Sequence, residues 1–238
     1  MEILNSVFLP MLTGHLIADF WLQPDTWVQH KRKNGWKSKK LILHAGLASL
    51  LPVLFTFQLN LWWFFPVIFV LHFVTDIFKS KLPDKIPAFL ADQLLHIAVL
   101  WILATLATHV SISENLSRFW IYAAGFVLVT NPTGIFTGMF LNAVIPDKNK
   151  KSKPDVSAWI GIFERVLIII FITTGQFSSI GFLIAAKSVF RFNDTREDGN
   201  KKAEFFLLGT LISFTLAIIV GLLINRLLSS GSTLNIKL

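Results

Sequence analysis

Residues 71–96 read LHFVTDIFKSKLPDKIPAFLADQLLH and join the end of one apolar segment to the start of the next. The stretch holds two histidine and aspartate pairs with a spacing of four, His72 with Asp76 and Asp92 with His96. On a helix, positions i and i+4 lie one above the other on one face, so each pair can direct a ring nitrogen and a carboxylate oxygen at one point. This spacing is typical of a metal chelate.

A third pair of the same kind, His15 with Asp19, lies in the first apolar segment, and His44 begins the second. In a chain with 14 acidic residues, any one histidine has roughly a one-in-eight chance of an acid four positions away. Three of the six histidines have one, all inside apolar runs, where ionisable groups are costly and mark functional sites. The pattern predicts that seven residues converge on one metal site: His15, Asp19, His44, His72, Asp76, Asp92 and His96.

The composition indicates a polytopic membrane protein. Hydrophobic residues make up 53% of the chain and charged residues only 15%, which is too apolar for an ordinary soluble domain. The formal charge of +8 comes from basic residues in short gaps between apolar runs, where they act as topology signals, so direct nucleic-acid binding is not expected. The chain has no cysteine, so nitrogen and oxygen atoms must hold any metal.

Apolar segments of about 20 residues cross a bilayer as helices, because only a helix satisfies its own backbone polar groups in lipid. The sequence predicts an all-α, polytopic transmembrane helical bundle with about eight spans. The chain divides into a four-helix metal-site half, residues 1–110, and a second transmembrane half with basic cytoplasmic loops, residues 111–238. The expected spans are 4–23, 41–59, 61–80, 86–108, 117–145, 156–174, 176–192 and 203–227.

Every second loop is basic: 30–40, 79–85, 148–153 and 187–202. The positive-inside rule makes these loops cytoplasmic and places both termini outside the cell. At 1.5 Å per helical residue, the seven predicted ligands then lie about 5–16 Å from the cytoplasmic loops. Four helices of alternating direction thus place their ionisable residues at one depth, in the cytoplasmic half of the membrane.

The second half carries candidate groups for binding an anionic substrate. Asn131 and Pro132 interrupt a span, either as a kink that neighbouring groups repair or as a broken helix that exposes backbone dipoles to a ligand. Glu164 must be paired or protonated, and Lys187 is at a suitable depth to be its partner. Lys187 and Arg191 either extend to the anionic leaflet or form a phosphate clamp that faces the metal site.

Four imidazoles and three carboxylates suit one or two divalent ions, zinc first and manganese second. Three clustered carboxylates would repel one another without a cation, so a metal ion is expected among them. A divalent metal centre activates water, which makes hydrolysis the expected reaction class. We expect His30 and His109 to be structural, Gln93 to be a secondary partner of the ligands, and Lys79, Lys81 and Lys85 to be loop charges.

Several motifs resemble the bacterial membrane-protein family catalogued as domain of unknown function 3307, over most of the chain. They are HLIADFWLQ from His15, LHA around His44, LHFVTDIFK from Leu71, DQLLH from Asp92, GFLIAAKSVFRF from Gly181 and AEFFLLGTLISF from Ala203. More distantly, helices with spaced His and Asp resemble inner-membrane metal-dependent hydrolases related to zinc-dependent phospholipase C. That resemblance implies a zinc hydrolase in the bacterial cytoplasmic membrane.

Three functions remain open. The first is a membrane-embedded metal-dependent hydrolase that acts on a phosphorylated or ester-containing lipid or amphiphile from the cytoplasmic leaflet. The second is a transporter that uses intramembrane histidine and aspartate for metal or proton coupling. The third is a scaffold in which a coordinatively closed metal only holds four helices together.

Overall fold

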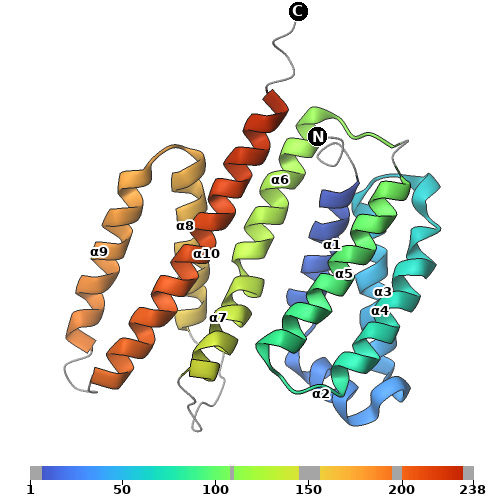
Figure 1. Ribbon diagram of the computed structural model, residues 1–238, viewed down its shortest axis with the longest axis horizontal. Helices are drawn as coiled ribbons and strands as arrows, with labels where there is room; N and C mark the ends of the chain where they lie inside the picture. The colour runs from blue at the N-terminus through green and yellow to red at the C-terminus, as the bar shows by residue number, and fades with distance from the viewer. Residues whose placement is uncertain (1–6, 108–109, 145–155, 195–199, 233–238) are drawn as a thin grey trace, which may run out of the picture. The chain divides into compact units, whose positions relative to one another are not determined.

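The computed structural model describes residues 7–107, 110–144, 156–194 and 200–232, and the side chains of this part except 190–194, 200–203 and 231–232. Within these residues the fold is all-α: it contains ten α-helices and two short 3-10 helices, and no β-strand (Figure 1). The prediction of an all-α fold is therefore confirmed. His109 lies outside the described residues.

The chain forms two compact units, and each is described by itself. Unit 1 comprises Met1–Val127 with Ser230–Leu238, and unit 2 comprises Leu128–Ser229. The sequence analysis divides the chain after residue 110, whereas the compact units divide it after residue 127. The helices that begin in unit 1 are α1 (Phe8–Phe20), α2 (Asp25–Asn34), α3 (Lys39–Phe55), α4 (Phe64–Ser80), α5 (Ile86–Leu106) and α6 (Glu114–Val129). The remaining helices are α7 (Asn131–Val144), α8 (Val156–Thr173), α9 (Phe177–Asp194) and α10 (Asn200–Ser232).

Several helices are compatible with a multi-pass membrane protein. In the part of the chain that the structure describes, four helical segments can cross a bilayer by length and composition: Ile86–Leu106, Glu114–Val144, Val156–Thr173 and Glu204–Ser230. A fifth is added if α2, with the 3-10 turn η1 (Gly35–Lys37), and α3 count as one bent span. Every predicted span contains an apolar helix, but α1 has 13 residues and α3 and α4 have 17 each. Eight crossings therefore remain a prediction.

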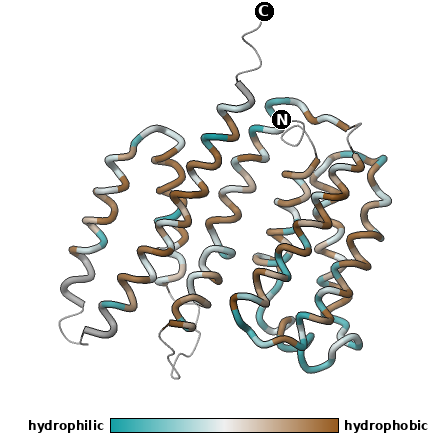
Figure 2. The backbone as a smooth tube through the Cα atoms, viewed as in Figure 1, coloured by the Kyte–Doolittle hydropathy of each residue, from teal (hydrophilic) through white to brown (hydrophobic). Residues whose placement is uncertain are grey.

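The four-helix part of unit 1 buries several polar side chains and exposes many large apolar ones. Helix α1 packs against α3 and α5, and α4 packs against both α3 and α5. Leu43, Val70 and Leu94 are more than half exposed, whereas a histidine from each of these four helices is buried. Figure 2 shows apolar residues along these helices and polar residues at the end that contains α2. Lipid is the solvent that suits such a surface, because apolar side chains face outward at no cost there.

The contact between α1 and α3 depends on a glycine. A Cβ atom at Gly14 would lie 2.6–2.8 Å from backbone atoms of Leu51 and Pro52 in α3, which cannot move aside as a side chain can. We expect Gly14→Ala to separate the two helices and to lower the midpoint of thermal unfolding in detergent. Gly46→Ala in α3 is the matched control, because no atom lies within 4 Å of its added Cβ. Equal midpoints for the two variants would contradict this view of the packing.

Residues 30–40 are a loop in the sequence analysis, whereas the structure forms helix α2 and the turn η1 there. Helix α2 ends at Gly35, whose φ of 54° is in the left-handed region that glycine adopts without strain. The Ser38 hydroxyl then accepts a hydrogen bond from the Leu41 N–H at 3.2 Å and caps α3. The end of α2 at Gly35 and the cap at Ser38 produce a bend of 106° between the segments before and after Ser38.

The Asn131-Pro132 interruption separates α6 from α7, and nearby donors satisfy the carbonyl groups at the break. Pro132 has no N–H for the Leu128 carbonyl, and the Thr133 hydroxyl donates to that carbonyl at 2.8 Å instead. Arg165 donates to the carbonyls of Val129 and Thr130, the latter at 3.0 Å. These bonds fit the interpretation of the interruption as a repaired kink.

Candidate metal centre

The seven histidine and aspartate side chains predicted to form a site gather inside unit 1, and we call them the His–Asp cluster. All are buried, with side-chain exposures of 7% or less. The i,i+4 spacing accounts for the contribution of three helices, because it turns both members of each pair toward the core. The members are His15 and Asp19 from α1, His44 from α3, His72 and Asp76 from α4, and Asp92 and His96 from α5.

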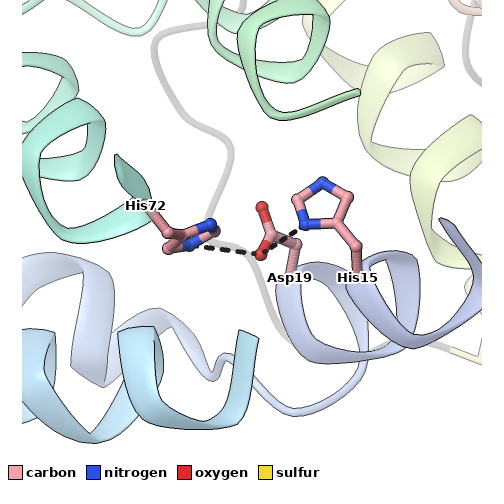
Figure 3. A group of neighbouring side chains, drawn as sticks. All are labelled: His15, Asp19 and His72. Carbon is pink, nitrogen blue, oxygen red and sulfur yellow. Dashed lines mark ion pairs between the residues drawn. The ribbon is translucent and has the colours of Figure 1, made fainter. Parts of the chain in front are cut away.

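The Asp19 carboxylate is at the centre of the cluster. Its Oδ1 atom lies 3.4 Å from His44 Nε2, 3.6 Å from His72 Nε2 and 3.7 Å from His15 Nδ1. Figure 3 shows the His15 and His72 rings on either side of this oxygen. Among the described residues, no donor forms a hydrogen bond with Asp19 Oδ1, although the atom is buried. A buried carboxylate oxygen without a donor is costly, and a cation among the three imidazoles would satisfy it.

Four distances between these atoms are close to the edge length of a tetrahedral metal site. Two ligand atoms about 2.1 Å from a tetrahedral centre lie about 3.4 Å apart. The His44 and His72 Nε2 atoms lie 3.0 Å apart, which is close to the same edge length. Gln93 Oε1 lies 3.4 Å from the other nitrogen of His15, in the position of the acceptor that orients a ligating imidazole. His44 departs from that pattern, because its Nδ1 has no such partner among the described residues.

Two lysines neutralise the other two carboxylates. Lys31 of α2 is buried, and its Nζ lies 2.5 Å from Asp76 Oδ2. Lys79 pairs with Asp92. The expectation that Lys79 is a loop charge is therefore wrong, because Lys79 belongs to α4 and pairs with a buried carboxylate of α5. Lys31 is not among the residues predicted from the sequence, since it is one of several adjacent basic residues and no periodicity distinguishes it.

Gln93 connects the α1 and α5 parts of the cluster. Its Nε2 donates to Asp19 Oδ2 at 3.2 Å and to Asp92 Oδ2 at 3.1 Å. His96 Nε2 lies 3.3 Å from Asp92 Oδ1, and the His96 ring stacks on His72 with ring centroids 4.0 Å apart. This network holds the rings in place around Asp19 and explains why Gln93 is buried.

A small cavity adjoins the cluster. It measures about 10 Å³, which is room for about one water molecule. The imidazoles of His15, His72 and His96 line one part of it, and apolar side chains that include Ile68 and Leu100 line the rest. A water molecule there would have nitrogen partners on one side only.

The residues predicted to bind an anion belong to unit 2. Glu164 and Lys187 form an ion pair, as the sequence analysis expects, and Lys187 Nζ also lies 5.0 Å from the centroid of the Phe214 ring. Asn131 is the first residue of α7, and the side chain of Arg191 lies outside the described residues. A phosphate clamp that faces the metal site remains a prediction. His30 bonds the Ser38 hydroxyl at 2.7 Å and has no part in the cluster.

Comparison with known proteins gives one positive finding. No curated protein and no solved structure matches the chain. The resemblance to metal-dependent hydrolases therefore stays a prediction. A family model matches residues 7–126, which is half of the chain, includes the whole His–Asp cluster and ends beside the boundary of unit 1. The chain belongs to the family described as protein of unknown function (DUF3307).

Proposed function

We propose that the His–Asp cluster binds a divalent metal ion inside the membrane and that the protein is a metal-dependent hydrolase. The observation that carries the proposal is the buried Asp19 Oδ1 atom, which has three imidazole nitrogens at 3.4–3.7 Å and no hydrogen-bond donor. Zinc is the ion that suits such a set of nitrogen and oxygen atoms, and manganese is the alternative. His15, Asp19 and His72 would supply three ligands and leave a fourth position for water, whereas His44 as a fourth ligand would close the site.

The charges of the cluster favour one ion over two. Lys31 and Lys79 already compensate Asp76 and Asp92, so only Asp19 lacks a cation. A second ion would have to displace a lysine ammonium group from its carboxylate. Asp92 and His96 lie close enough to Asp19 to hold a second ion after such a displacement.

The cavity beside three imidazoles supports hydrolysis. A catalytic zinc site keeps a position for water, and zinc-bound water ionises near neutral pH. Space for about one water molecule lies beside His15 and His72, two of the proposed ligands. The protein's own contribution is to hold the rings, exclude further water and place the nucleophile inside the lipid phase.

We further propose that the chain crosses the bacterial cytoplasmic membrane eight times with both termini outside, so that the cluster lies in the cytoplasmic half. A substrate from the inner leaflet would be a phosphorylated or ester-containing lipid or another amphiphile. Lys187, Arg191, Glu164 and Asn131 are the candidates for binding its anionic group. The basic segments between the apolar helices support this orientation.

The small size of the cavity favours a second candidate function, a metal-stabilised scaffold. The cluster is buried on four helices, and the cavity beside it does not accommodate a lipid headgroup. A structural site is coordinatively closed, whereas a catalytic site exchanges its water. A hydrolase would turn over a substrate and a scaffold would not, but both would bind a metal ion.

Metal analysis of purified protein, run with a turnover screen on labelled phospholipids, tests both functions. We expect His15→Ala, His44→Ala and Asp92→Ala each to lower the metal content, because each removes a ligand or disturbs the network around one. His109→Ala is expected to leave the metal content unchanged. If wild-type protein contains no metal, both functions are excluded; metal without any hydrolysis would favour the scaffold.

A further inference from the structure

The segment formed by α2 and η1 presents a basic and aromatic surface. Eight of the ten residues of α2 are polar or charged. Lys33 in α2, Lys37 in η1 and Lys39 at the start of α3 are exposed, and Trp36 is 65% exposed. This surface is too polar to cross a membrane and too aromatic for a purely aqueous face.

The bend after η1 gives this segment its orientation. It makes an angle of 106° with α3, whose apolar residues pack among α1 and α4. If α3 runs across the bilayer, α2 runs nearly along the bilayer surface. An amphipathic or basic helix in that orientation lies among the lipid headgroups.

Two ion pairs fix which face of α2 turns inward. Lys31 reaches the buried Asp76 of α4, and Arg32 pairs with Asp84 in the connection between α4 and α5. Figure 1 shows α2 at the same end of unit 1 as that connection. Lys81 and Lys85 of the connection are also exposed. The exposed lysines of both segments are therefore gathered at one end of the unit.

The tryptophans of the segment lie beside lysines. Lys37 Nζ lies 5.4 Å from the centroid of the Trp36 ring, and Lys40 Nζ lies 5.1 Å from that of Trp27. Indole rings prefer the headgroup region, where the ring is in an apolar environment and its N–H is hydrated. A lysine beside such a ring is placed at the depth of lipid phosphates.

We propose that α2 and η1 form a binding surface for the headgroups of anionic phospholipids. Charge complementarity selects the ligand: apart from Asp25 at the start of α2, the exposed charged groups of the surface are cations, and the neighbouring carboxylate of Asp84 is already paired with Arg32. The inference goes beyond the proposed hydrolase and does not depend on it, because no member of the His–Asp cluster belongs to α2 or η1. Through Lys31, however, the same helix connects the lipid surface to Asp76.

The test is a titration of detergent-solubilised protein with short-chain phosphatidylglycerol, followed by tryptophan emission, with phosphatidylcholine of the same chain length as the neutral probe. We expect phosphatidylglycerol to bind and phosphatidylcholine to bind at least about tenfold more weakly, since each basic residue near an anionic surface contributes about fivefold. The double variant Lys33→Gln with Lys37→Gln should lose about tenfold or more in affinity for phosphatidylglycerol.

The matched control removes two cations elsewhere, Arg118→Gln with Arg226→Gln, and should keep the wild-type affinity. Far-ultraviolet circular dichroism and the metal content of each variant show whether the fold is intact. Trp36→Phe, which keeps both lysines, should bind the lipid with a reduced emission change. Equal affinity for the two lipids, an unchanged affinity in the lysine variant, or full displacement by inorganic phosphate at the concentration of the lipid would overturn the proposal.

Discussion

Replacement of Asp19 by alanine is expected to remove the metal ion from the purified protein. Three imidazole nitrogens face its Oδ1 atom, and no other carboxylate of the cluster is free of a lysine. Loss of a group that only orients a ligand lowers metal affinity about 10–100-fold, so loss of a central ligand should lower it by more than about 100-fold. Atomic emission analysis after equilibration with zinc and removal of free metal measures the effect.

Two further variants make the Asp19 prediction specific. Asp19→Asn keeps the shape of the side chain and an oxygen for the Gln93 amide, but it removes the charge, so it should also lose the metal. Asp25→Ala, an exposed aspartate at the start of α2, is the control for an acid outside the cluster and should keep the metal. Full metal content in Asp19→Asn would show that the carboxylate is not a ligand.

The convergence of the seven cluster residues could be predicted from the sequence because two regular signals agree. The i,i+4 spacing places both members of a pair on one helix face, and the rise per residue places His15, His44, His72 and His96 at one depth. Both signals are properties of single helices. They need no knowledge of how α1, α3, α4 and α5 pack against one another.

The lysine partners could not be predicted in this way, because their contacts are tertiary. Lys31 belongs to α2, which the sequence analysis treats as a loop, and its long side chain passes from the surface of unit 1 to Asp76 in α4. Lys79 is at the end of α4 in the sequence, yet its ammonium group reaches Asp92. Nothing in the spacing of basic residues distinguishes an inward lysine from an exposed one.

The lengths of α3 and α4 could not be predicted from the sequence either. A count of apolar residues cannot detect where a helix ends within an apolar run. Helix α3 contains Pro52 and ends at Phe55, and Phe57 follows with a φ of 54°, so the residues up to the start of α4 form turns and the short 3-10 helix η2 (Leu59–Leu61) and do not continue α3. As a result, α3 and α4 are shorter than the segments predicted for them.

Lys31→Met is expected to lower the free energy of unfolding by about 3–5 kcal/mol, because it leaves the Asp76 carboxylate buried without its counter-ion. Lys31 and Asp76 have side-chain exposures of only 8% and 3%, so water cannot replace the lost ammonium group. Chemical or thermal unfolding in detergent, followed by circular dichroism, measures the change. Arg32→Met is the matched control from the next position of α2, since its pair with Asp84 is largely exposed and contributes at most about 1 kcal/mol.

The double variant Lys31→Met with Asp76→Asn separates the loss of a charge pair from the loss of packing. If the unpaired carboxylate is the cause, removal of its charge should restore most of the lost stability. Added zinc should also restore part of it in Lys31→Met alone, because Asp76 lies with His44 and His72 in a group that could hold an ion. No recovery in either experiment would mean that Lys31 stabilises unit 1 through the packing of its methylene chain, and that Asp76 does not require a cation.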